Sequence, residues 1–131
     1  MDKEKKHKIL IVDDDSFLLD MYALKFSQSN FEVYTCLGSE KVIEKLKGGL
    51  EPDIMLLDIV MPGMDGFELM EKMNQEGVAK NTIKIILSNR GQSSDVTRGE
   101  ELGASGYIVK ANTTPSEVIG KVMEIMESKN K

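Results

Sequence analysis

The stretch Ile9-Leu10-Ile11-Val12-Asp13-Asp14-Asp15 indicates the fold class of this chain. Its aliphatic residues, several of them β-branched, run without interruption and stop abruptly at the aspartates. A strand with one solvent-exposed face alternates apolar and polar residues, whereas a strand covered on both faces is apolar throughout. We therefore predict that Ile9–Val12 is an inner strand of a parallel sheet with helices on both faces.

The same order, a short apolar strand followed by an amphipathic helix, repeats along the chain. The predicted strands are Ile9–Val12, Phe31–Cys36, Ile54–Leu57, Thr82–Leu87 and Gly106–Val109. The predicted helices follow the capping residues Ser16, Ser39, Asp65 and Thr114, and a weaker helix spans Ser93–Leu102. Asp65 with Glu68, and Thr114 with Glu117, have the spacing of a capping box. Strands that alternate with helices in this way predict an α/β domain with a parallel sheet.

Length and composition are those of one ordinary globular domain. The chain has 131 residues, of which 40% are hydrophobic and 30% charged, so disorder and a disulfide scaffold are excluded. The formal net charge is −5 and no basic block occurs, which argues against direct nucleic-acid binding. The single cysteine, Cys36, cannot form an internal disulfide and fits a reducing compartment.

No stretch of the sequence predicts a membrane span or a secretory leader. The longest aliphatic runs, such as Ile9–Val12, are far shorter than the roughly 20 residues that a bilayer requires. Residues 1–7 form a short charged tail that is followed only by a strand-like run. We therefore expect a cytoplasmic protein in which residues 8–131 form a single domain.

Polar side chains stand at the predicted carboxyl ends of four strands. Asp13-Asp14 end the first strand, Asp58 the third, Ser88 the fourth and Lys110 the fifth. Ligands bind outside the carboxyl ends of strands in open parallel sheets, so we expect these residues to converge. Clustered carboxylates repel one another unless a cation joins them, and this set suits Mg²⁺ together with a phosphoryl group. One carboxylate would be the nucleophile, while Lys110 and Ser88 would stabilise the phosphoryl oxygens.

Four motifs, taken in order, resemble the receiver domain of two-component response regulators, in particular the chemotaxis-regulator type. They are Ile9–Asp14, Leu56–Gly66, Ile86–Ser88 and Gly103–Lys110. The resemblance extends over essentially the whole chain, from Lys8 to Ser128. It implies a flavodoxin-like, doubly wound sheet of five strands in the order 2-1-3-4-5.

The resemblance also implies roles for the acidic residues. Asp58 would accept a phosphoryl group from a partner histidine kinase or phosphotransfer protein. Asp14, Asp58 and the backbone carbonyl of Val60 would hold Mg²⁺ (or Mn²⁺), and Asp13 would act mainly through bound water. The chain would then be a phospho-acceptor that catalyses only its own phosphotransfer and slow autodephosphorylation, and not a conventional enzyme.

A switch and an output surface are implied in the same way. The hydroxyl of Ser88 would move towards the phosphoryl group, and the ring of Tyr107 would turn inward behind it. Because little sequence follows the fifth predicted helix, we expect a stand-alone receiver, without an output domain, that acts on a downstream protein target. Phosphorylation would alter a surface built from helix four, strand five and helix five. We expect the protein to be a monomer or a weak dimer.

One residue near the site departs from the family pattern, and two others are expected to affect the lifetime of the phosphoryl group. Ala111 follows Lys110 where receivers commonly have proline after a cis peptide bond, so we expect the loop Lys110–Thr114 to be either trans or strained. Val60 offers no group to orient a water molecule, and Arg90 is expected to reach either the phosphoryl group or an acidic neighbour. Together these two residues favour a fairly long-lived phosphorylated state.

Each residue also has a plainer structural interpretation. Asp13-Asp14-Asp15 would form a solvated turn before a helix, and Asp15 is assigned to that role. Ser88 would be a loop hydroxyl, Lys110 a surface charge and Tyr107 a core or edge aromatic residue.

Three other functions, from different classes, fit the sequence less well. The pattern Asp13-x-Asp15-x-Phe17 half resembles the opening motif of a haloacid-dehalogenase-type phosphatase, although no second acidic pair follows Lys110. A nucleotide-binding or flavin-binding module would need a glycine-rich phosphate loop that the sequence lacks. A pseudo-receiver, which keeps the fold without being phosphorylated, is supported only by Ala111. His7 is the only histidine and lies in the charged tail, so a histidine phosphodonor must come from another protein.

Overall fold

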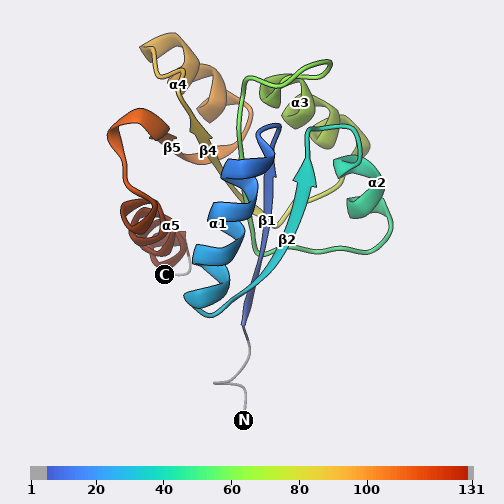
Figure 1. Cartoon of the computed structure of the whole chain (residues 1–131). Helices are drawn as coiled ribbons and strands as arrows, with labels where there is room; N and C mark the ends of the chain where they lie inside the picture. Colours follow the sequence, from blue (N-terminus) through green and yellow to red (C-terminus); the bar gives the residue numbers. More distant parts are fainter. Residues whose placement is uncertain (1–5, 130–131) are drawn as a thin grey trace.

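Residues 6–129 are described by a computed structural model in which five parallel strands alternate with five α-helices (Figure 1). The strands are β1 (His7–Asp13), β2 (Phe31–Leu37), β3 (Ile54–Leu57), β4 (Ile83–Ser88) and β5 (Ala104–Val109). The helices are α1 (Ser16–Gln28), α2 (Val42–Lys47), α3 (Gly66–Glu76), α4 (Ser93–Glu101) and α5 (Pro115–Lys129). A short 3-10 helix, η2 (Lys110–Asn112), joins β5 to α5. The strand order β2-β1-β3-β4-β5 confirms the predicted flavodoxin-like topology.

The inner strands are continuously apolar because both of their faces are covered. β3 is buried along its whole length, and β1 is buried from Ile9 to Asp13. In the parallel register, Val12 pairs with Cys36 on one side and with Leu57 on the other. This register brings the residues that follow β1 and β3 to the same edge of the sheet.

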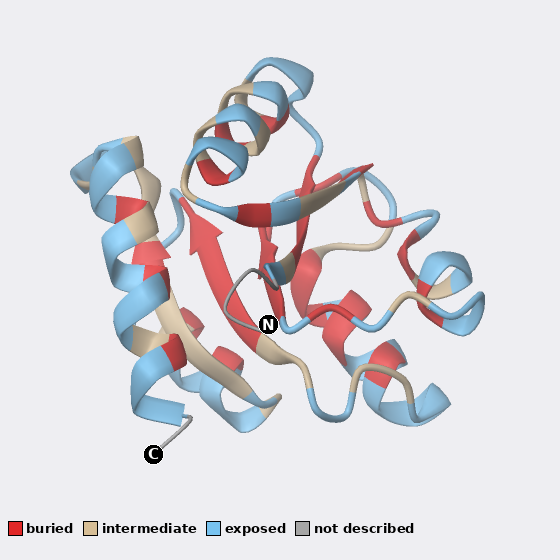
Figure 2. Ribbon diagram, turned by 90° about the horizontal axis from the view of Figure 1, so that it is seen from below, coloured by how far each residue is buried: buried red, intermediate tan, exposed pale blue. Residues whose placement is uncertain are grey.

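The helices cover both faces of the sheet and enclose two hydrophobic cores, as Figure 2 shows by the buried strands and the exposed outer faces of the helices. α1 and α5 cover one face, and Phe26 and Val122 are fully buried there. α2 and α3 cover the other face, where Phe67 is fully buried. α4 approaches this second core closely because Gly99 has no Cβ, which would lie 2.7 Å from Ile86 Cδ1. None of the helices within residues 6–129 is both long and apolar enough to cross a membrane.

Both predicted capping boxes are present. Asp65 Oδ1 accepts a hydrogen bond from the Glu68 N–H at 2.8 Å, and Glu68 Oε1 accepts one from the Asp65 N–H at 2.9 Å. Thr114 and Glu117 exchange the same two bonds at the start of α5, at 3.2 and 2.8 Å. These side chains bind backbone N–H groups that have no partner inside the helix, so α3 and α5 begin where predicted.

The prediction that Ser16 and Ser39 cap the first and second helices is wrong. Asp15, and not Ser16, is the N-cap of α1, because its carboxylate accepts hydrogen bonds from two N–H groups of the first turn at 3.0 and 3.1 Å. Ser39 does not cap α2, because its hydroxyl donates to the carbonyl of Met64 at 2.7 Å. α2 therefore begins only at Val42 and has no side-chain cap.

β1 begins earlier than predicted, at His7, which the sequence placed in the charged tail 1–7. The extension is held by Lys8, whose N–H donates to Asp53 Oδ2 at 2.8 Å and whose carbonyl accepts from the Asp53 N–H at 2.9 Å. Residues 1–5 of the predicted tail lie outside the described residues. Other strand ends differ by one or two residues: β2 ends at Leu37, β4 spans Ile83–Ser88 and β5 begins at Ala104.

Candidate functional site

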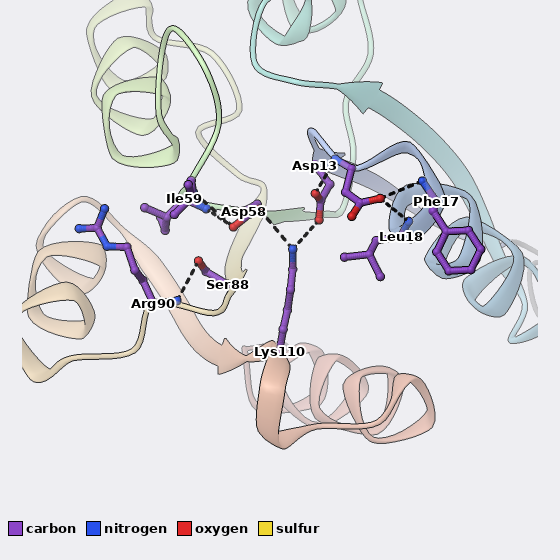
Figure 3. Close-up of polar contacts among 10 residues, drawn as sticks. Asp13, Phe17, Leu18, Asp58, Ile59, Ser88, Arg90 and Lys110 are labelled. Carbon is purple, nitrogen blue, oxygen red and sulfur yellow. Dashed lines mark hydrogen bonds and ion pairs between the residues drawn. The ribbon is translucent and has the colours of Figure 1, made fainter.

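The polar residues at the strand ends converge at the carboxyl edge of the sheet (Figure 3). Asp13 is the last residue of β1, and Asp58 follows β3 directly, with its N–H donating to the Val12 carbonyl at 3.0 Å. Ser88 ends β4, and Lys110 follows β5 directly. Segments far apart in the sequence therefore contribute to one site.

Three aspartates form an acidic cluster at this edge. Asp13, Asp14 and Asp58 each place one carboxylate oxygen within 4.8 Å of the others. Asp13 and Asp58 are 3% and 6% exposed, whereas Asp14 is exposed to solvent. Buried carboxylates this close repel one another unless a cation offsets their charge. The donor set is all oxygen and open on the side of Asp14, which fits Mg²⁺, a cation that takes few carboxylates and keeps several waters.

The ammonium of Lys110 lies among these carboxylates. Its Nζ is 2.8 Å from Asp13 Oδ2 and 3.2 Å from Asp58 Oδ2, and its side chain is 9% exposed. Burial alone lowers the pKa of Lys110, but the hydrogen bond to Asp13 and the charges of Asp58 and Asp13 outweigh it, so the pKa is raised. Lys110 is therefore held in its cationic form between two acidic residues.

The sequence allowed a trans or a strained backbone after Lys110, and the structure shows the trans one. No cis peptide bond occurs within the part of the chain that the structure describes, the bond between Lys110 and Ala111 included. The chain turns instead through η2, and the Thr113 hydroxyl donates to the Val109 carbonyl at 2.9 Å. The turn thus places Lys110 at the site without a proline at position 111.

Backbone hydrogen bonds orient the Asp58 carboxylate. Its Oδ1 accepts from the N–H groups of Ile59 and Val60 at 2.7 and 3.3 Å, while its Oδ2 faces Lys110. Gly66 holds the turn that follows, because its N–H donates to the Ile59 carbonyl at 2.8 Å. A Cβ on Gly66 would lie 2.3 Å from the carbonyl oxygen of Asp58, so this close approach requires glycine.

Ser88 and Tyr107, the predicted switch pair, are linked through Arg90. Ser88 is fully buried, and its Oγ accepts a hydrogen bond from the Arg90 N–H at 3.3 Å. The Tyr107 hydroxyl donates to the Arg90 carbonyl. The Arg90 side chain points away from Asp58 (Figure 3). The side chain of Val60, the other residue expected to affect the phosphoryl group, is 54% exposed.

One residue beside the site, Asp95, was not predicted from the sequence. Of the two partners expected for Arg90, the structure shows the acidic one: Arg90 Nη2 lies 2.8 Å from Asp95 Oδ1. Asp95 Oδ2 also accepts from the Gln92 N–H at 3.2 Å. Arg90 and Arg98 both lie over the ring of Phe67, with Cζ 5.9 and 4.6 Å from its centroid. Gln92 and Asp95 have the spacing of a capping box at the start of α4, and this spacing is the sequence signal that could have indicated Asp95.

The sequence matches a known family over most of its length. Residues 9–122 match the family described as response regulator receiver domain. The chain is 32% identical over 119 residues to the phosphate regulon transcriptional regulatory protein PhoB of Rhizobium meliloti, covering 91% of the chain and 52% of that protein. It is 31% identical over 128 residues to the transcriptional regulatory protein ResD of Bacillus subtilis, covering 96% and 50%. The chain thus spans about half the length of these curated relatives.

Solved structures of receiver domains have the same fold. A putative response regulator from Chloroflexus aurantiacus has a TM-score of 0.82 and 30% identity, covering 94% of this chain and 99% of the other. A CheY-like receiver domain protein from Methanospirillum hungatei has a TM-score of 0.85 and 25% identity, covering 96% and 98%. The acidic cluster of Asp13, Asp14 and Asp58 is typical of the metal site in such domains. The chain therefore belongs to the response regulator receiver domain family, as a phospho-acceptor module of phosphorelay signalling and not a conventional enzyme.

Proposed function

We propose that Asp58 accepts a phosphoryl group from the phosphohistidine of a partner histidine kinase or phosphotransfer protein. The observation that carries this proposal is the 3.2 Å contact between Lys110 Nζ and Asp58 Oδ2 inside the acidic cluster. One oxygen of Asp58 is fixed by backbone N–H groups, and the other lies beside an ammonium. A carboxylate held in this way is oriented as a nucleophile while its charge is offset.

In the proposed transfer, a carboxylate oxygen of Asp58 forms a bond to phosphorus as the phosphorus–nitrogen bond of the donor breaks. The electron pair of the broken bond leaves with the donor imidazole, so no further reactant is needed. Lys110 would offset the negative charge of the phosphoryl oxygens, and the Ser88 hydroxyl would donate a hydrogen bond to one of them. Such a transfer depends mainly on positioning and electrostatic stabilisation.

The same cluster supports a cation site for Mg²⁺ (or Mn²⁺). Asp14, Asp58 and the backbone carbonyl of Val60 would hold the cation, and Asp13 would act mainly through bound water. When bound, the cation would offset the charge of Asp58 and of the incoming phosphoryl oxygens. The exposure of Asp14 supports a direct role for it, and the 2.8 Å bond from Lys110 to Asp13 supports an indirect role for Asp13.

Phosphorylation would act as a switch. It adds roughly 1.5 to 2 negative charges at pH 7 beside the buried hydroxyl of Ser88. Ser88 would turn from Arg90 towards the phosphoryl group, Tyr107 would turn inward behind it, and the surface of α4, β5 and α5 would change its affinity for a downstream protein. The net charge of −5 supports a protein target over direct contact with nucleic acid. We expect the domain to act in the cytoplasm as a monomer or weak dimer.

Asp15 disfavours the alternative of a haloacid-dehalogenase-type phosphatase. That function would need Asp15 as an acid beside a nucleophilic Asp13. The Asp15 carboxylate instead accepts the N–H groups of Phe17 and Leu18 at the start of α1. A pseudo-receiver is disfavoured because the acidic cluster and Lys110 are fully assembled.

Phosphorylation by acetyl phosphate tests the proposal. The protein, Asp58→Asn and Asp20→Asn are incubated with acetyl phosphate, with and without Mg²⁺, and their intact masses are recorded. Asp20 is an exposed aspartate on α1, outside the cluster, and serves as the matched control. We expect a gain of one phosphoryl group that requires Mg²⁺ and Asp58 and persists in Asp20→Asn. No gain under any condition, together with no binding of beryllofluoride, would contradict the proposal and favour the pseudo-receiver.

A further inference from the structure

We propose that a hollow at the amino edge of the sheet binds a small multivalent oxyanion, with Lys84, Lys80 and Lys129 as its cationic contacts. The three lysines come from β4, from the loop before β4 and from the end of α5. The hollow lies at the opposite end of the strands from the acidic cluster. The inference therefore goes beyond the proposed function and does not depend on it.

The buried ammonium of Lys84 has no acidic partner within residues 6–129. Lys84 is 7% exposed, and its Nζ donates to the carbonyls of Ala79 and Thr82 at 2.6 and 3.3 Å. It forms no ion pair with the described residues, and burial is the only influence on its pKa, which is lowered. An ammonium has three N–H groups, so one is left without an acceptor among these residues. Because an unpaired buried charge is costly, a bound anion would stabilise this lysine.

The strand register places Lys84 on a core face, but beyond the helices that cover that face. Lys84 pairs with Met55 on β3 and with Ala104 on β5, and both of these residues pack in the second core. At this end of β4 the covering helices have ended, α3 at Glu76 and α4 at Glu101. A hollow of about 370 Å³ remains there beside Lys84.

The lining of this hollow is basic and polar. None of its lining residues within the described part of the chain is acidic. Lys80 and Lys129 are exposed, and neither forms an ion pair within residues 6–129. Its volume lies in the range of sites for small molecules, roughly 300–1,000 Å³. The hollow can therefore bring three unpaired ammoniums to one small ligand.

A bulge in β5 adds a neutral donor to the same lining. The register between β4 and β5 shifts after Lys84, because Ile85 pairs with Gly106 and leaves Ser105 without a partner. A bulge of this kind changes the direction of a side chain. Ser105 and Asn81 both line the hollow. Hydroxyl and amide donors beside ammoniums suit the several oxygens of a phosphoryl or carboxylate group.

The helix ends at this edge oppose the lysines, but only in part. The carboxyl ends of α3, α4 and α5 each carry about half a negative charge, roughly 1.5 in total. The three ammoniums carry twice that charge with the opposite sign. One carbonyl at the end of α4, that of Leu102, already accepts a hydrogen bond from Asn74 Nδ2 at 3.1 Å. The hollow therefore stays cationic in a protein whose net charge is −5.

Titration with pyrophosphate and with citrate tests the site. The buffer contains no Mg²⁺, its ionic strength is held constant with sodium chloride, and backbone amide resonances are followed by NMR. We expect saturable shifts at Asn81 and Ser105 with at least one of the two probes, and none at Asp58. Tighter binding of pyrophosphate would assign the site to phosphoryl compounds, and tighter binding of citrate would assign it to polycarboxylates.

Two variants remove the proposed cationic contacts. Lys80→Gln combined with Lys129→Gln should bind about tenfold more weakly, roughly threefold for each exposed lysine. Lys84→Met should also bind at least about tenfold more weakly, because it removes a buried charged donor. The matched control combines Lys72→Gln on α3 with Lys121→Gln on α5, two exposed lysines outside the hollow. It makes the same change in net charge and should bind like the original protein.

Each contrary result would overturn a definite part of the inference. Absence of saturable shifts with both probes would overturn the site. Equal weakening in the control pair would overturn it as well, because binding would then follow the net charge. Unchanged affinity in a folded Lys84→Met would overturn the role of the buried lysine, and if this variant does not fold, the pair of exposed lysines decides the matter. No phosphoryl transfer is involved, so any of these results leaves the proposed function intact.

Discussion

Lys110 Nζ lies closer to Asp13 Oδ2 than to Asp58 Oδ2, at 2.8 Å against 3.2 Å. The lysine is therefore not dedicated to the proposed acceptor, because it offsets the charge of two nearly buried carboxylates at once. In the proposed transfer, a phosphoryl group on Asp58 would compete with Asp13 for the same ammonium. We therefore expect the ion pair between Lys110 and Asp13 to rearrange if Asp58 is phosphorylated.

Replacement of Lys110 by Met should destabilise the protein most strongly in the absence of Mg²⁺. The change leaves Asp13 and Asp58 buried together without an opposite charge, which should lower the free energy of unfolding by about 3 kcal/mol. Mg²⁺ should restore part of this loss, because cation binding stabilises the folded state that holds the cluster. Urea unfolding with and without Mg²⁺ measures both effects. Lys84→Met is the control, because Lys84 is also buried but binds backbone carbonyls and not carboxylates. An equal recovery of stability by Mg²⁺ in Lys84→Met would contradict the prediction.

Replacement of Gly66 by Ala should disturb the proposed acceptor through its backbone. The added Cβ would lie 2.3 Å from the Asp58 carbonyl oxygen and 2.8 Å from the Ile59 Cα, so the turn must shift. We expect a loss of about 1–3 kcal/mol in unfolding free energy and slower phosphorylation by acetyl phosphate. Gly120→Ala on α5, where a Cβ meets nothing within 4 Å, should instead stabilise by about 0.5–1 kcal/mol. Equal stabilities of the two variants would show that the turn has room for a side chain.

The order of the elements and the position of the site could be predicted because both follow from local sequence patterns. A continuous apolar run marks a strand covered on both faces, and β3 is found at the predicted residues Ile54–Leu57. The capping box of Asp65 and Glu68 involves only neighbouring positions, and it is present. The parallel order of the strands then brings Asp13 and Asp58 to one edge.

The partners of individual side chains could not be predicted, because they depend on distances between elements. Ser39 has the composition of a helix cap, yet its hydroxyl binds Met64, 25 positions away along the chain. The sequence left two partners open for Arg90, and only the placement of α4 beside the loop brings Asp95 to the guanidinium. Local patterns carry no information on such distances.

The buried lysine of β4 should give the protein a specific alkaline pH dependence. Lys84 is 7% exposed, and burial lowers its pKa below the ordinary value of 10.5. Between the lowered pKa and 10.5 the unfolded chain binds more protons than the folded one, so this contribution to stability grows as the pH rises. This contribution is fully present above the pKa of Lys84 in the unfolded chain. It is lost as the pH falls through the lowered pKa of Lys84 in the folded protein.

Urea unfolding of the original protein and Lys84→Met at several pH values checks this dependence. The difference in unfolding free energy should shift in favour of the original protein as the pH rises towards 10.5. The comparison of the two proteins removes the contribution of tyrosines, which titrate in the same range in both. A difference that is independent of pH would contradict a lowered pKa for Lys84.

Val60 should give the phosphorylated protein a long lifetime. Its apolar side chain is 54% exposed two residues after Asp58, and it has no group to orient an attacking water. Arg90 is bound to Asp95 and points away from the site (Figure 3). After removal of acetyl phosphate, the phosphorylated mass should therefore decay over minutes or longer. A decay within seconds would contradict this role of Val60.

A polar side chain at position 60 should shorten that lifetime. In Val60→Gln, an amide can hold a water near phosphorus, and we expect decay about tenfold faster, equivalent to ~1.4 kcal/mol of activation free energy. Leu24→Gln makes a similar apolar-to-amide change at a residue of α1 that is 59% exposed, and should leave the decay unchanged. If both variants decay at the rate of the original protein, the water is oriented by another group, and the apolar character of Val60 does not set the lifetime.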